Sequence, residues 1–305
     1  MNRLAAIAGG IIIVTTSVPV WAIDQATAPH DKAFWRAIAA QKFVVPAGES
    51  VSVLVRELSG YLGSPDPELR DDIAYTTLAA WIYRQRIVPA DVTRTLLEEW
   101  TRHLSAGIGE RGTDSIFKRS FSALSLGIVA ILDNEAPFLE RAEFDRLLVA
   151  AITYLGAERD TRGFDPVKGW MHSVAHTADL LKFLGRSRYL TKDQQAAILS
   201  GVSAKLDQVP EVLTHGEDER LARAVLSIIA RQDFDASGFE KWMASLAPVR
   251  PAGEPTPASL ATAQNRKNLV VSLFALLSTD PRDLPTLQAA RAAVLPVLKK
   301  LHGVG

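Results

Sequence analysis

The chain has 305 residues, of which 48% are hydrophobic and 22% are charged, proportions typical of a globular protein with a core and not of disordered or collagen-like chains. Its 34 basic residues balance its 34 acidic ones, which excludes a nucleic-acid binder or a membrane adhesin that works by bulk positive charge. The absence of cysteine excludes disulfides, thiolate metal sites and cysteine nucleophiles.

The first 22 residues have the pattern of a secretory signal peptide. Arg3 supplies a positive charge, residues 4–14 are apolar, and Val20-Trp21-Ala22 matches a cleavage signal. An uncleaved membrane anchor is the alternative, because no charge lies between residues 4 and 23, but Pro19 makes this stretch a poor membrane span. We therefore predict an exported protein, periplasmic or secreted, with no stable membrane insertion after cleavage.

Residues 23–305 carry the apolar period of an α-helix almost throughout. The stripes include Val92, Leu96, Leu97, Trp100 and Leu104; Phe117, Phe121, Leu124, Ile128 and Ile131; and Leu221, Val225, Leu226 and Ile229. Capping residues precede several of them, as at residues 113–115 and 191–193. No alternating segment is long enough for a sheet, so the predicted fold class is all-α.

The predicted helices pair into hairpins. About twelve helices form about six hairpins that recur every 40 to 55 residues or so, the range of helical-repeat proteins. This predicts a single-domain, irregular α-solenoid over residues 23–305, with a Pro-rich loop at residues 247–259. A closed α/α ring needs a similar number of helices and remains the alternative.

Two of the six histidines lie within the segment 168–181. If this segment is helical, His172, His176 and Asp179 share a face within about 60°, since each residue turns the helix by about 100°. Trp170 falls on the opposite, apolar face. The side chains of two histidines and one aspartate are thus predicted to project from the same face of the helix.

Imidazoles four residues apart on a helix can hold one divalent ion, here Zn or Mn. Asp179 could complete the ligand set of His172 and His176 or orient one ring. The segment is not the metalloprotease motif His-Glu-x-x-His, because residue 173 is Ser. A polar site without metal and a purely structural role of these residues are the alternatives.

Acidic residues cluster before alternate helices. If the hairpins stack in register, these clusters and interleaved arginines lie along one edge, beside the histidine segment; the alternative is that helix N-termini simply attract carboxylates. The predicted groove is lined by Asp71, Asp72, Asp114, Arg119, Asp165, Trp170, His172, His176, Asp179, Glu217 and Asp218.

Four stretches, residues 62–75, 107–126, 169–181 and 217–222, together resemble the bacterial domain-of-unknown-function family numbered 2785. The resemblance spans about residues 34–230. It implies a helical protein with no assigned activity, so no catalytic residue is carried over.

The sequence therefore predicts an exported helical-repeat protein that binds a ligand or a protein partner in the polar groove, with no nucleic-acid partner. Solenoids present extended surfaces that suit recognition. The alternative is a hydrolase or lyase, either metal-assisted through His172, His176 and Asp179 or based on carboxylates.

Overall fold

The computed structural model describes residues 29–247 and 254–303. The predicted signal peptide lies outside the described residues, as do residues 248–253 of the predicted Pro-rich loop. The all-α prediction is confirmed, since helices dominate and the one small sheet has two strands of two residues each.

The elements follow one another in hairpin fashion. The N-terminal half contains α1 (Lys32–Ala40), α2 (Val51–Tyr61), η1 (Glu68–Tyr75), α3 (Thr76–Leu78), η2 (Ala79–Arg84), α4 (Ala90–His103), α5 (Ser115–Glu135) and α6 (Arg141–Ala157). The C-terminal half contains β1 (Phe164–Asp165), β2 (Gly169–Trp170), α7 (Ser173–Leu184), α8 (Lys192–Gln208), α9 (Glu217–Ile229), α10 (Ala236–Ser245), α11 (Pro257–Thr279) and α12 (Pro285–Leu301).

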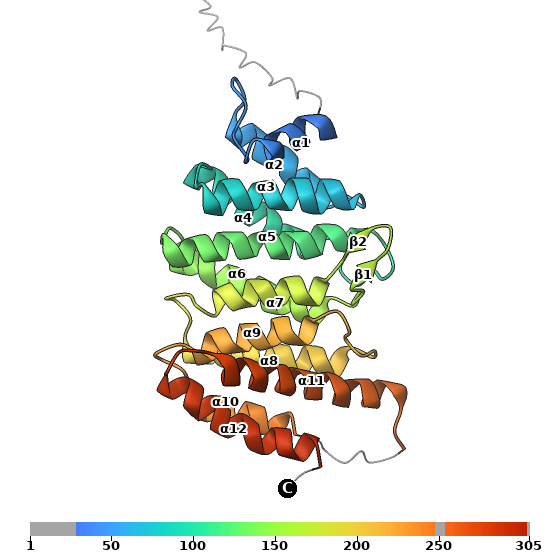
Figure 1. The fold of residues 1–305 in the computed structure, drawn as a ribbon, viewed down its shortest axis with the longest axis vertical. Helices are drawn as coiled ribbons and strands as arrows, with labels where there is room; N and C mark the ends of the chain where they lie inside the picture. Colours follow the sequence, from blue (N-terminus) through green and yellow to red (C-terminus); the bar gives the residue numbers. More distant parts are fainter. Residues whose placement is uncertain (1–28, 248–253, 304–305) are drawn as a thin grey trace, which may run out of the picture.

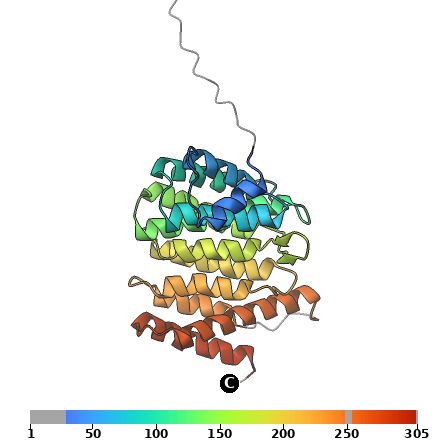
Figure 2. The ribbon, with the colours of Figure 1, turned by 45° about the horizontal axis from the view of Figure 1, so that its top comes forward.

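The helices stack along one long axis, from α1 and α2 at one end to α12 at the other (Figure 1). One row consists of α5, α7, α9 and α11, whose successive members make the most extensive contacts in the molecule. In the second row α6 packs on α8 and α10 on α12. The tilted view shows the same layers (Figure 2). A surface along the first row can therefore combine residues from several distant segments.

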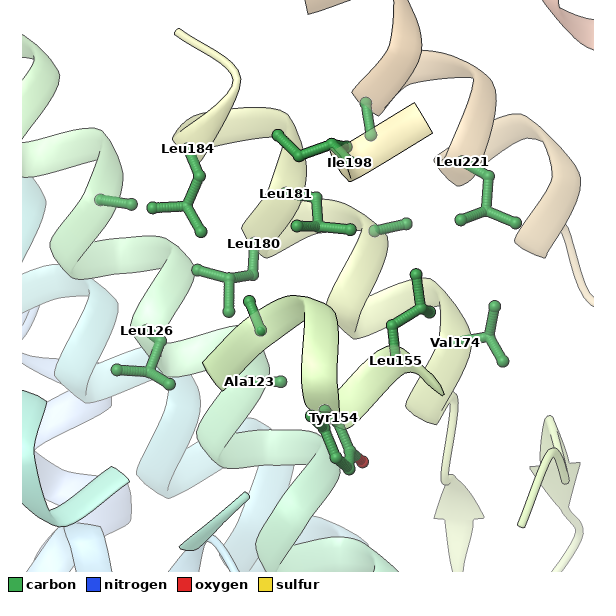
Figure 3. Close-up of a cluster of buried hydrophobic side chains, with 14 of the residues drawn as sticks. Ala123, Leu126, Tyr154, Leu155, Val174, Leu180, Leu181, Leu184, Ile198 and Leu221 are labelled. Atoms are coloured by element: carbon green, nitrogen blue, oxygen red, sulfur yellow. The ribbon is translucent and has the colours of Figure 1, made fainter. Parts of the chain in front are cut away.

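The core is continuous through these layers. Leu126 of α5, Leu180 and Leu181 of α7 and Leu221 of α9 are fully buried and contribute to one cluster (Figure 3). The helix α5 is long and apolar enough to cross a membrane, but most of that stretch is buried inside the protein. Its apolar character is accounted for by its central position, since it packs against both η2 and α7.

The segment Glu68–Arg84 is wound more widely than an α-helix over most of its length. The backbone N–H of Thr76 donates to Asp71 O, and that of Gln85 donates to Ala80 O at 2.8 Å, both five residues back. Such π-helical winding is rare and is often found at functional sites.

The predicted helix over residues 168–181 is wrong in its first part. Phe164 pairs with Trp170 in an antiparallel hairpin, and α7 starts only at Ser173. The hairpin turn is closed by Asp165, whose Oδ1 accepts the N–H groups of residues 167 and 168, both at 2.8 Å. Gly169 has a φ of 73°, a left-handed conformation that glycine adopts without steric cost.

Candidate functional site

Residues from four elements meet where the first turns of α7 and α9 lie beside η1 and the β-hairpin. We call this group the histidine cluster; it comprises Arg70, Asp71, Tyr75, Trp170, His172, His176, Asp179, His215 and Arg220. The sequence prediction had placed His172, His176 and Asp179 on one helix face. The structure keeps them together, although His172 precedes the helix.

His172 sits at the N-cap of α7 with a φ of 46°. Its ring stacks on Trp170 with centroids 4.2 Å apart, so Trp170 lies beside the histidines and not on an opposite face. His172 Nε2 lies 3.1 Å from the carbonyl oxygen of His215. A carbonyl can only accept, so Nε2 carries the proton. Burial, reinforced by the positive charge of Arg220, lowers the pKa of His172 to about 4.

His176 is held by a hydroxyl group of α5. Its Nδ1 lies 2.7 Å from Ser120 Oγ, and this hydroxyl donates to the carbonyl oxygen of Met171. Ser120 therefore accepts from His176, whose proton is on Nδ1. Burial, followed by the proximity of His172, holds the pKa of His176 well below its ordinary value.

Each imidazole consequently has one nitrogen that is satisfied internally and one that is not. His172 Nδ1 and His176 Nε2 have no hydrogen-bond partner among residues 29–247 and 254–303. The rings lie edge to face, with centroids 5.7 Å apart. At neutral pH the two rings are uncharged, and together they present two hydrogen-bond acceptors.

Asp179 is neutralised by two cations. Arg220 donates to Oδ2, and Lys182 Nζ lies 3.1 Å from Oδ1. Tyr75 belongs to the same environment: burial, together with the negative charges of Asp179 and Asp71, raises its pKa to about 12. Its hydroxyl therefore stays protonated at neutral pH.

Asp71 is the cluster's other carboxylate. Burial raises its pKa to about 6, although Arg70 NH2 lies 3.8 Å from its Oδ2. Arg70 is itself fully buried and donates to the carbonyl oxygens of Ser64 and Lys168 at 2.8 and 2.6 Å. Arg70 thus joins η1 to the hairpin and fixes the place of Asp71.

The cluster reaches the surface through aromatic side chains. Trp170 is 41% exposed, and Phe164 packs edge to face against it at 4.7 Å between centroids. A cavity of about 410 Å³ adjoins the cluster through His215 and includes Gly163 and Glu217 in its wall. A side chain at Gly163 would meet the His215 ring, since its Cβ would lie 2.3 Å from Cγ.

Other predicted site residues lie at the edges of the cluster. Asp165 closes the hairpin turn, and Asp114 accepts from Lys168 Nζ at 2.6 Å, so both stabilise the hairpin. Glu217 is buried and accepts the His215 N–H at 2.8 Å, which orients the turn that His172 contacts. Asp72 is exposed beside Asp71.

Two predicted residues do not belong to the cluster. Arg119 is fully buried, and its Nε donates to Glu158 Oε2 at 2.6 Å, so it does not line a groove. Asp218 accepts from Ser272 Oγ of α11 at 2.6 Å. Each of these two side chains is engaged by partners from its own surroundings, Glu158 for Arg119 and Ser272 for Asp218.

The part of the chain that the structure describes contains no complete set of metal ligands. No three His, Asp or Glu residues are grouped there so as to hold an ion. Asp179 is occupied by Arg220 and Lys182, which leaves only the free nitrogens of His172 and His176. A Zn or Mn site at these residues stays a prediction.

The sequence prediction placed Arg70 and Arg220 along the polar edge without counting them in the groove lining, and it did not assign Tyr75, His215 or Ser120 to the site. For Arg70 and Arg220 a signal existed, since arginines alternate with the acidic clusters. For Ser120 and the backbone of His215 there was none, because their roles depend on the packing of α5 against α7 and on a turn.

The comparisons with known proteins agree with the resemblance in the sequence. The model of a protein family of unknown function (DUF2785) matches residues 104–275, more than half of the chain. The chain belongs to this family. The match includes Trp170, the three histidines of the cluster, Asp179 and Arg220, and it begins after η1. No curated protein and no solved structure matches the chain.

Proposed function

We propose that this member of the DUF2785 family is an exported binding protein that recognises a ligand at the histidine cluster. The observation that carries the proposal is the pair of neutral imidazoles, each with its N–H already satisfied and a free nitrogen beside the half-exposed Trp170. Neither free nitrogen is among the fully buried polar atoms that lack a partner, so both are open to a ligand that supplies donors.

The chemistry of the cluster defines what such a ligand carries. Two imidazole nitrogens accept hydrogen bonds, so the ligand presents hydroxyl or N–H groups. The Trp170 ring is stacked on His172, and its exposed part offers apolar surface to the ligand. Sugars and peptides combine both features.

A panel of immobilised neutral oligosaccharides and peptides tests this proposal. The chain without residues 1–22 is expected to retain a subset of the panel, and Trp170→Ala and His172→Phe to lose that subset. His172→Phe keeps an aromatic ring on Trp170 but removes the acceptor. Leu260→Ala, at an exposed side chain of α11, is the control and retains it. Retention of nothing by folded protein, or equal retention by all variants, contradicts the proposal.

A hydrolase or lyase is the second candidate, and Asp71 is the residue that favours it. A carboxyl group whose pKa is about 6 can transfer protons near neutral pH. Asp179 is held by two cations and is not available as its partner. Turnover of a retained ligand that Asp71→Asn abolishes, while binding persists, would establish this alternative over simple binding.

Export is proposed from the first 22 residues alone. Expression in a secretion-competent bacterial host is expected to yield protein that starts at Ile23, as measured by N-terminal sequencing of the exported fraction. Full-length protein retained in the membrane would support the anchor instead.

A further inference from the structure

A second concave site lies at the other end of α7 and α9, where both helices finish. It is a cavity of about 830 Å³, within the range of small-molecule sites. Its charged wall residues are Lys182, Arg186, Arg188, Arg223, Arg231, Arg282 and one acid, Asp233. We call it the arginine cavity. The excess of cations is local, because the whole chain has no net charge.

Most of these cations have carboxylate partners that do not line the cavity. Arg188 pairs with Asp133, Arg223 with Glu219 and Arg282 with Asp280. Lys182 pairs with Asp179, and only the partner of Arg231, Asp233, belongs to the wall. These pairs fix the direction of the cationic side chains and leave the cavity itself poor in negative charge.

Arg186 differs from the others. Among the described residues it has no carboxylate partner; its Nε donates to Ser227 Oγ at 3.2 Å, and its guanidinium lies 5.3 Å from the Phe183 ring centroid. Arg186 is an exposed residue of the cavity wall; partial desolvation by its neighbours, and then the positive charge of Arg282, lowers its pKa. Arg186 and Arg282 both line the cavity, but only Arg282 has a carboxylate partner, Asp280, so Arg186 is the cation that is free to take an anion.

We propose that the arginine cavity binds a small molecule that carries at least two oxyanion groups, phosphoryl or carboxyl. Guanidinium groups match such groups through paired, charge-assisted hydrogen bonds. An oxyanion group bound at Arg186 would give its unpaired guanidinium a charge partner, and the neighbouring cations of the cavity wall would add attraction. The balanced charge of the whole chain favours a small ligand over a nucleic acid. This inference is independent of the ligand at the histidine cluster.

Calorimetric titration of the chain without residues 1–22 with pyrophosphate and with citrate tests the proposal. At least one of them is expected to bind at low ionic strength, and the tighter one identifies the phosphoryl or the carboxyl group as the preferred oxyanion. Loss of one charge-assisted contact in Arg186→Ala is expected to weaken binding by about 10-fold to 100-fold. Salt is expected to weaken it as well, since the Debye length falls to about 8 Å at 0.15 M.

Two further variants make the test decisive. Arg282→Ala changes a half-exposed side chain and is expected to weaken binding similarly, so the result does not depend on the folding of Arg186→Ala alone. Arg266→Ala removes an arginine that pairs with Asp207 outside the cavity, and binding is expected to persist. The proposal is overturned if neither anion binds more tightly than chloride, or if Arg186→Ala and Arg282→Ala both bind as the native chain does.

Discussion

Two buried polar groups of this protein differ in how completely they are satisfied. Arg119 donates to Glu158 through Nε and NH2 and to the carbonyl oxygens of residues 106 and 107 through NH1. In the histidine cluster, His172 and His176 each make one such bond and leave a nitrogen free. The contacts of Arg119 hold α5 to the loop after α6. The free nitrogens of the histidine cluster leave it able to bind a ligand.

The difference is also visible in exposure and charge. Both members of the Arg119–Glu158 pair are buried, and their charges cancel. The histidine cluster borders a half-exposed tryptophan and keeps its imidazoles neutral. Burial alone therefore does not distinguish a structural ion pair from a candidate site; the free imidazole nitrogens beside an exposed side chain make that distinction here.

Arg119→Met is expected to have the largest effect on folding. It leaves Glu158 as an uncompensated buried charge, which typically costs about 3–5 kcal/mol of unfolding free energy. Chemical denaturation measures the loss. Arg141→Met, which breaks an exposed pair with Asp145, is the control and is expected to cost less than about 1 kcal/mol. Equal losses in the two variants would remove the structural role assigned to Arg119.

Acid is expected to destabilise the protein through the two histidines. An unfolded histidine gains a proton below its ordinary pKa, about 6.5, while folded His172 stays neutral down to about pH 4. The unfolded state then binds more protons, so the contribution of His172 is present above about pH 6.5 and is lost toward pH 4, and the lowered pKa of His176 acts in the same direction. The slope contributed by His172 rises from about 0.7 kcal/mol per pH unit at pH 6.5 toward about 1.4 kcal/mol per pH unit near pH 5, which urea titrations over this range measure.

The titration of Asp71 has the opposite effect on the pH dependence of the unfolding free energy. Its folded pKa, about 6, lies above that of an unfolded aspartate, so the folded state binds its proton first and gains stability as pH falls below 6. Asp71→Asn removes this compensation, and the loss between pH 6.5 and 5 is expected to grow by about 1 kcal/mol. An unchanged pH dependence would show that the Asp71 carboxyl is not buried as described.

Gly163→Ala is expected to disturb the turn that orients His172. The new Cβ would overlap the His215 ring, and such overpacking costs about 1–3 kcal/mol. Gly156→Ala in α6 is the control, because nothing lies within 4 Å of its added Cβ, and it is expected to stabilise slightly. Thermal unfolding of both variants measures these changes in stability. If Gly163→Ala leaves the stability unchanged, the His215 side chain moves aside freely.

The smallest effect is expected at Asp72. This side chain is exposed, and Asp72→Asn is expected to change the unfolding free energy by less than about 0.5 kcal/mol. Chemical denaturation of Asp72→Asn and Asp71→Asn at pH 7 measures the change in unfolding free energy for each variant. A larger effect at Asp72 than at Asp71 would reverse the assignment of the two neighbouring carboxylates.

The helices and part of the cluster follow from the sequence, since apolar stripes such as Leu96 and Trp100 are buried and His172 and His176 lie together. The β-hairpin did not follow, because helical periodicity assumes a uniform backbone and Gly169 interrupts it. The buried position of Arg119 did not follow from the sequence either. Whether an arginine pairs inside or faces outward depends on neighbours, such as Glu158, that only the packed structure brings close.

Nitrogen-15 NMR of the imidazole rings at pH 7 reports which ring nitrogen carries a proton, and so tests whether each histidine of the pair keeps a free acceptor. The account predicts neutral rings, with His172 protonated at Nε2 and His176 at Nδ1, and with the other nitrogen of each ring free. A doubly protonated ring, or the opposite tautomer at either residue, would contradict it.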